Sequence, residues 1–243
     1  MIGLLGKKLG QTRVYDEHGD LVPVTGVLAG PNCVLQCKTA ATDGYDAVQL
    51  GFDGQKEQRL AKGVLGHIRK HGGPPVRRIH EFRGFSLAVK PGDVVGPAVF
   101  AAGDFVDAIG VTKGRGFEGV VKRQKFQGGD STHGSKGWHR RPGAIGQRLF
   151  PGTVMRGTRM PGHMGRVQRT IQNLEVVQVM EADNLLLVKG AIPGACGDYV
   201  VIRESKKIPK AKAEQRRQAL AAAAKAKEAA KAEGKAGAKT GKR

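Results

Sequence analysis

The side chains that could do chemistry in this sequence gather between residues 111 and 170. Asp130, Ser131 and His133 supply the residue types of an acid, a nucleophile and a base. Residues that are so close along the chain rarely reach the geometry of a catalytic triad, and no oxyanion-hole pattern accompanies them. We therefore interpret them as polar loop residues that contact phosphate and sugar groups, and we predict no catalytic residue.

A glycine motif begins the same stretch. Residues 114–119 read GRGFEG, which fits the pattern GxGxxG, and a strand-like run precedes them. A dinucleotide site would also need a βαβ unit with an acidic ribose ligand about 20 residues further on. Residues 132–136 read THGSK and offer no acid there. The motif therefore does not predict a nucleotide cofactor, although a nucleotide-using enzyme stays open as a hypothesis that equilibrium dialysis would test.

The spacing of cysteines and histidines gives no metal pattern either. Cys33 and Cys37 are four residues apart in a β-like run and Cys196 is distant, whereas zinc needs four ligands. His67 and His71 share a helical face, but the residues between them lack the glutamate of a zinc-protease helix. We predict no metal and no disulfide framework. The odd cysteine count fits a reducing cytosol, so we expect a soluble cytoplasmic protein with no membrane partner.

Positive charge is concentrated in two parts of the chain. Residues 111–170 hold 13 Lys or Arg against two acids, and residues 205–243 hold 13 against three. The remaining residues carry 15 basic and 16 acidic side chains, so nearly all of the net charge of +20 lies in the two segments. A solvated charged face would mix both signs. The pattern therefore predicts a near-neutral body with two cationic arms that bind a dense polyanion, and nucleic acid is the obvious one.

The form of the central arm favours RNA over DNA. Its 13 glycines let backbone N–H groups approach phosphate oxygens closely, and arginine makes forked contacts with phosphate. The sequence contains no helix-turn-helix, zinc finger or leucine zipper, and irregular cationic loops suit the crevices of folded RNA. The Ala/Lys-rich tail resembles a linker histone, so a histone-like DNA-compacting protein is the alternative; deleting Lys210 to Arg243 would separate the two hypotheses.

Short β-branched or alternating runs lie on both sides of the basic stretch. They predict a mainly β fold whose closed barrel is built from both halves of the chain, because closure removes exposed strand edges. Residues 55–71 have helical spacing. The expected organisation is as follows: a barrel from 1–52, 91–112 and 171–204; a small, partly helical α+β insertion at 53–90; a long irregular basic loop at 113–170; and a disordered or helical basic tail at 205–243.

Several motifs together resemble one family, the bacterial form of the third protein of the large ribosomal subunit. The opening, residues 3–12, is similar to that family's start, with Gln11 where many members have Met. Residues 142–147, 160–165 and 185–194 resemble its loop motifs and closing strands. The resemblance runs from about 2 to 204. The family signature is present at the right spacing in Phe100, Asp107, Gly110, Thr112, Gly114, Arg115, Gly116, Gly119 and Arg123.

This resemblance implies a β-barrel of the translation-protein type and a structural role without catalysis or cofactor. It implies a primary rRNA-binding protein that binds near the 3′ end of the large-subunit (23S-type) rRNA and nucleates assembly, with its loop reaching toward the peptidyl-transferase region. The implied protein partners are the fourteenth and nineteenth large-subunit proteins. Gln147 corresponds to a glutamine that is N-methylated in some bacteria, so a glutamine methyltransferase is a further expected partner. No small-molecule substrate is expected.

The residues that we expect to contact RNA combine cations with hydrogen-bonding and stacking side chains. Trp138 could stack on a base or could anchor the loop. The predicted RNA-binding set is Lys7, Lys8, Lys113, Arg115, Lys122, Arg123, Lys125, His133, Ser135, Lys136, Trp138, His139, Arg140, Arg141, Arg148, Arg156, Arg159, His163, Arg166 and Arg169.

Overall fold

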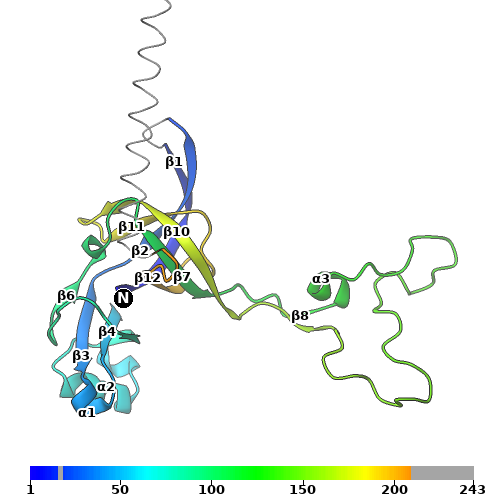
Figure 1. Ribbon diagram of the computed structural model, residues 1–243, viewed down its shortest axis with the longest axis horizontal. Coiled ribbons are helices and arrows are strands. Elements are labelled where there is room, and N and C mark those ends of the chain that lie inside the picture. Colours follow the sequence, from blue (N-terminus) through cyan, green and yellow to red (C-terminus); the bar gives the residue numbers. More distant parts are fainter. Residues whose placement is uncertain (16–18, 209–243) are drawn as a thin grey trace, which may run out of the picture. The chain divides into compact units, whose positions relative to one another are not determined.

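A computed structural model describes residues 1–15 and 19–208 (Figure 1). The chain forms two compact units: residues 1–110 together with those from 169 onward, and residues 111–168. The predicted basic tail lies outside the described residues from position 209 onward. Among the helices of the described ranges, none is long and apolar enough to cross a membrane.

The first unit contains the predicted closed barrel. Its strands follow the order β1-β12-β7-β10-β11-β2 around the closed sheet. β1 is paired with β12, and Gly3 lies opposite Arg203. Strands from both halves of the chain therefore close the sheet, which confirms the predicted fold class. The bounds are β1 (Gly3–Tyr15), β2 (Leu21–Leu28), β7 (Phe105–Val111), β10 (Gln168–Met180), β11 (Leu185–Lys189) and β12 (Tyr199–Glu204).

The barrel strands bury apolar side chains in the core, and β12 shows the simple alternation of a strand with one buried face. Leu4, Val27, Val106, Leu186 and Ile202 are fully buried in one apolar core. The β1–β2 pairing needs a glycine at position 6, where a Cβ atom would lie 2.7 Å from a methyl group of Val27. A larger residue there would push the two strands apart, so this glycine is required by close backbone approach.

One buried carboxylate connects three barrel strands. Asp107 of β7 is 1% exposed in its side chain and accepts a hydrogen bond from the Asn173 backbone N–H on β10 at 3.1 Å. The same carboxylate pairs with the Arg203 guanidinium on β12 at 3.3 Å. A buried carboxylate needs such partners because leaving it unpaired costs several kcal/mol. This residue of the expected family signature therefore has a structural role.

A second sheet, in the order β5-β4-β3-β6, was not predicted. Residues 32–39 and 47–52 were assigned to the barrel, but they form β3 (Asn32–Lys38) and β4 (Ala47–Gly54) of this sheet. β5 (Val76–Arg83) lies within the range expected for the α+β insertion, and β6 (Val94–Val95) is cut short before the 3-10 turn η2 (Pro97–Val99). Pro97 explains the shortening because it has no N–H for the ladder.

The side chain of Asn32 directs the chain from the barrel into this second sheet. It is fully buried, and its oxygen accepts the Leu5 N–H at 3.1 Å. Its amide nitrogen donates to the carbonyls of Leu5 and Ala29, both at 3.0 Å. These bonds fix the end of β2 against β1, so the following residues cannot continue the barrel ladder.

The helical insertion is smaller than expected. Residues 55–71 contain a 3-10 turn, η1 (Glu57–Arg59), and then α2 (Lys62–Lys70), whose Ile68 is buried with Leu35 and Val76. His67 lies in a polar network and not at a metal site: its Nε2 is 2.8 Å from Gln49 Oε1. Partial burial and the nearby cations lower the pKa of His67. The first unit also contains α1 (Ala40–Asp43).

Candidate nucleic-acid interface

The basic segment is mainly irregular, as expected, but it also has a folded base that the sequence did not predict. Thr112 N–H donates to the Val167 carbonyl at 2.9 Å, and Arg115 N–H donates to the Met164 carbonyl at 2.9 Å. The pairing continues into β8 (Phe117–Glu118) and β9 (Gly162–His163), and α3 (Val120–Gln124) follows. We call residues 111–125 and 160–168 the stem, and residues 126–159 the outer loop. Figure 1 shows β8 and α3 in this unit.

A glycine allows the two stem chains to approach. Gly165 has φ +79°, a left-handed conformation that side chains rarely adopt. A Cβ atom at this position would overlap the Lys113 carbonyl oxygen and press on Gly114 Cα. The glycine is therefore needed both for its dihedral angle and for the contact between the chains.

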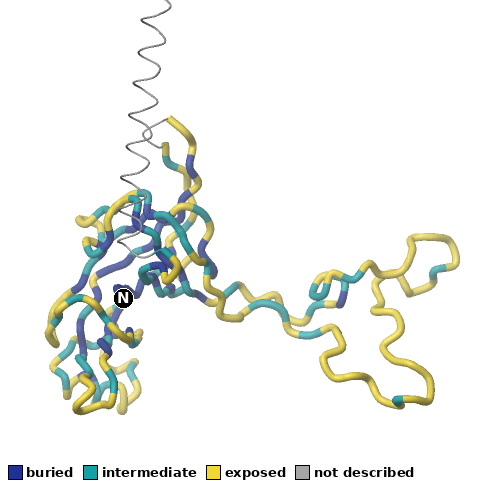
Figure 2. Tube along the Cα trace, in the orientation of Figure 1, coloured by how far each residue is buried: buried dark blue, intermediate teal, exposed yellow. Residues whose placement is uncertain are grey.

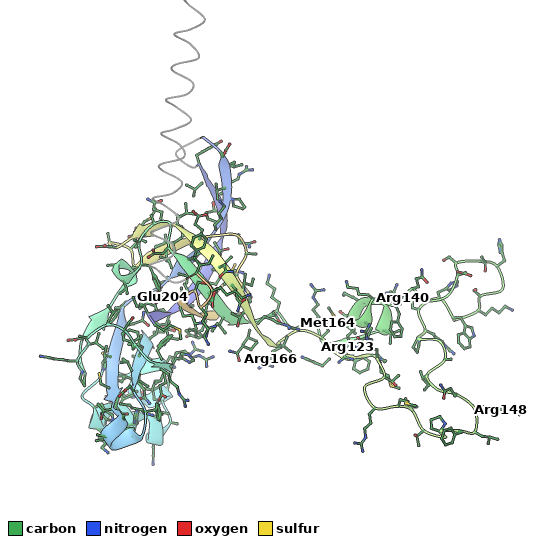
Figure 3. All side chains as sticks on the ribbon, in the orientation of Figure 1. Arg123, Arg140, Arg148, Met164, Arg166 and Glu204 are labelled. Carbon is green, nitrogen blue, oxygen red and sulfur yellow. The ribbon has the colours of Figure 1, made fainter. Side chains whose placement is uncertain are left out.

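Arg123 holds the stem together from α3. Its Nη1 donates to the Met160 carbonyl at 2.6 Å, and its Nε donates to the His163 carbonyl at 3.3 Å. Figure 3 labels Arg123 and Met164 in this stem. The guanidinium also packs on Gly162, where a Cβ would lie 3.2 Å away. Arg123 was predicted to contact RNA; because its Nη1 and Nε donate within the protein, we assign it a positioning role in the stem.

Replacing Arg123 should loosen the stem before any RNA is present. In the free protein, we expect Arg123→Ala to speed amide hydrogen exchange at Arg115 and Met164 about tenfold or more, because charge-assisted hydrogen bonds contribute about 1.5–3 kcal/mol each. Arg123→Lys should restore little of the protection from amide exchange, since one ammonium group cannot donate from two separate nitrogen atoms as the guanidinium does. The control is Arg148→Ala in the outer loop, which should leave exchange unchanged. Equal protection in wild type and Arg123→Ala would exclude the positioning role.

The outer loop exposes nearly all of its side chains to solvent (Figure 2). Asp130 is its only acid, and the sequence contains no other until Glu175. Leu149 and Phe150 are each 89% exposed, and Trp138 is 55% exposed. Exposed apolar side chains among cations are typical of surfaces that contact both the phosphates and the bases of single-stranded RNA.

Most of the predicted RNA-binding residues are accessible. Lys7 and Ser135 are half-buried, and the exposed members of the set are Lys113, Arg115, Lys122, Lys125, His133, Lys136, Trp138, His139, Arg140, Arg141, Arg148, Arg156, Arg159, His163, Arg166 and Arg169. Two of them have partners within the protein: Lys122 pairs with Glu118 at 2.8 Å, and the Arg141 guanidinium lies 5.0 Å from the centre of the Trp138 ring.

Lys8 is withdrawn from the proposed interface. Its side chain is buried, with the residue only 7% exposed, and its ammonium donates to the carbonyls of Ile192 at 2.6 Å and Gly194 at 3.0 Å. The ammonium therefore cannot reach a phosphate. The neighbouring Lys7 is more exposed because successive side chains of a strand point to opposite faces.

The first unit also presents a cationic cluster that the sequence interpretation did not select. The guanidinium groups of Arg78 and Arg77 on β5 lie 4.8 and 5.7 Å from the centre of the Tyr199 ring. The Tyr199 hydroxyl donates to Asp53, and partial burial with this carboxylate raises the pKa of Tyr199. Recognising residues 76–83 as a strand would have revealed the pair, since two adjacent arginines on a strand place at least one side chain on the solvent face.

No group of His, Cys, Asp and Glu in the described parts of the chain is arranged to hold a metal ion. The outer loop presents exposed cations, amides and aromatic rings. A barrel with a stem and a cationic outer loop is typical of a protein that binds structured nucleic acid.

Comparison with known proteins shows which protein family this chain resembles. The family description "Ribosomal protein L3" matches residues 67–184. The large ribosomal subunit protein uL3 of Deinococcus radiodurans is 51% identical over 212 residues, covering 87% of this chain and 99% of that protein. The protein of the same name from Geobacter sulfurreducens is 46% identical over 206 residues, covering 84% of this chain and 98% of that protein.

The chain therefore belongs to the ribosomal protein L3 family, as the sequence resemblance indicated. It is a structural protein of the large ribosomal subunit, and its location is the ribosome, which is cytoplasmic in bacteria. Family membership implies a structural and not an enzymatic role, with ribosomal RNA and ribosomal proteins as partners.

Proposed function

We propose that this chain is a primary rRNA-binding protein whose stem and outer loop enter folded large-subunit rRNA and neutralise its phosphates there. The observation that carries the proposal is the run from Ser131 to Leu174, which contains no acid while its basic side chains are exposed. Such a segment repels itself in water, so it gains most by packing against a dense array of phosphates. Two of its arginines, Arg140 and Arg148, come from separate stretches of the outer loop (Figure 3).

The structure supports a division of labour between the parts of the segment. The stem uses backbone pairing and Arg123 to fix where the outer loop begins. The outer loop carries glycines and arginines, so it can follow an irregular RNA surface and make forked phosphate contacts. Because these contacts would position the protein on RNA, the proposed role is recognition.

The family resemblance extends this proposal to particular sites and partners. We place the binding site near the 3′ end of the 23S-type rRNA, with a role in nucleating subunit assembly and with the outer loop directed toward the peptidyl-transferase region. The fourteenth and nineteenth large-subunit proteins are the proposed neighbours. Gln147 is exposed in the outer loop, which makes its amide accessible to a glutamine methyltransferase.

A double substitution in the outer loop tests the phosphate contacts. Arg140→Ala with Arg148→Ala should weaken binding to a 23S-type rRNA transcript roughly 10- to 100-fold at about 0.1 M salt. It should also flatten the slope of log affinity against log salt by about 1.4 to 1.8, because two phosphates are no longer neutralised. Filter binding over a salt series measures both quantities.

The matched control is Arg59→Ala with Lys62→Ala, which removes the same charge from exposed positions of the first unit. This control should change the affinity less than about threefold. If both double variants bound rRNA equally well, charge in the outer loop would not be the source of the affinity. Equal affinity of the wild type for duplex DNA of similar length would favour the DNA-compacting alternative.

A further inference from the structure

The structure assigns a second recognition element to the outer loop: we infer that a pocket beside Trp138 receives one unpaired RNA base. This inference rests on the proposed function and specifies how part of the same surface reads its RNA. The pocket has a volume of about 330 Å³. Its lining residues are Phe126, Gln127, Gly128, Gly129, Trp138, Arg141, Pro142 and Gly143.

Backbone contacts form the pocket before any ligand arrives. Gly129 N–H donates to the His139 carbonyl at 3.1 Å and joins the two chain segments that line it. A Cβ atom at Gly128 would overlap that same carbonyl oxygen, and one at Gly129 would lie 3.0 Å from the Trp138 carbonyl oxygen. The two glycines therefore allow an approach that residues with side chains would prevent, and the spacing of the walls is set by the main chain.

The lining suits a flat aromatic ligand with a polar edge. Trp138 is 55% exposed, so its ring is available, and the Arg141 guanidinium 5.0 Å from the ring centre adds a cation at the pocket. Phe126 supplies further apolar surface, and Gln127 supplies an amide that can both donate and accept hydrogen bonds. Indole rings and guanidinium planes are common stacking partners of unpaired bases in RNA recognition.

The charge around the pocket decides between a base and an apolar side chain of another protein. Lys125, Lys136 and Arg140 are exposed near the lining residues in sequence, and Asp130 is the only acid of the outer loop. A protein partner would need acidic side chains around its apolar residue to match these cations. Every RNA base, in contrast, is attached to a backbone whose phosphates supply that negative charge. A structural anchor would bury the tryptophan within the loop, yet more than half of this side chain remains exposed.

Trp138 is the only tryptophan of the chain, so its fluorescence reports on this pocket directly. The probe is a full-length 23S-type rRNA transcript, titrated into the full chain while filter binding measures the affinity separately. We expect quenching of at least about half of the tryptophan emission at saturation, because a base stacked on indole quenches it. Trp138→Ala should lower the affinity roughly 5- to 100-fold, and Trp138→Phe should retain most of it. Val94→Ala, which trims an exposed apolar residue of the first unit, is the control and should bind normally.

The outcomes separate this inference from the proposed function. Full-affinity rRNA binding with unchanged emission would overturn the base pocket and leave the proposed function standing. A blue shift without quenching would also overturn it, because the indole would then be covered by protein and not by a base. Absence of rRNA binding at low salt would overturn both proposals.

Discussion

Replacing residues 113–166 with a short glycine-serine linker should abolish high-affinity rRNA binding while the barrel stays folded. The linker removes twelve Lys and Arg against two acids. Each lost phosphate contact lowers the affinity further, so we expect a loss of about 1,000-fold or more at about 0.1 M salt. The barrel should tolerate the change because Thr112 and Val167, on either side of the removed chain, are already paired. Filter binding and urea unfolding measure the two effects.

The matched control keeps the chain length and removes only charge. In this variant, glutamine replaces five cations of the outer loop and the stem is left intact. The substituted residues are Lys136, Arg140, Arg141, Arg148 and Arg156. This variant should lose much of the affinity, and its far-UV circular dichroism should match that of the wild type. If the affinity of the linker variant for rRNA were within about tenfold of the wild-type affinity, the binding energy would come from the barrel unit instead.

Asn32→Ala should be among the most destabilising single substitutions in the barrel unit. It would leave the Leu5 N–H and the carbonyls of Leu5 and Ala29 buried without their side-chain partner. Each such group costs about 1–3 kcal/mol, so we expect the free energy of unfolding to fall by about 3–5 kcal/mol. Urea denaturation monitored by circular dichroism provides the measurement.

Gln11→Ala is the control for this substitution, because it removes an exposed amide from the same strand, β1. It should change the free energy of unfolding by less than about 0.5 kcal/mol. If Asn32→Ala were as mild as the control, water would be replacing the lost bonds, and the argument that Asn32 directs the chain into the second sheet would fail.

The barrel could be predicted because short β-branched or alternating runs lie on both sides of one basic segment. The second sheet could not. Residues 32–38 have the same β-like composition as the barrel strands, and their true partner depends on Asn32 meeting Leu5, 27 residues earlier in the chain. Local pattern identifies a strand, whereas a long-range hydrogen bond determines which sheet it joins.

The location of the proposed interface was inferred from charge, but the roles of single cations could not be inferred in this way. Lys7 and Lys8 are identical in type and adjacent, yet Lys8 is bound to a carbonyl 184 residues away. Arg123 matches the other arginines of the segment in composition, yet its guanidinium bonds to Met160, 37 residues away. Such roles depend on contacts between distant parts of the chain, which composition and spacing do not encode.

The salt dependence of rRNA binding tests the central claim most directly, since it counts the phosphates that the cationic segment neutralises. For the full chain on a 23S-type transcript, log affinity plotted against log salt should fall with a slope steeper than about −5. The linker variant should give a slope that is shallower by at least about 3. Parallel slopes for the two proteins would contradict the claim that residues 111–168 carry the electrostatic contact with RNA.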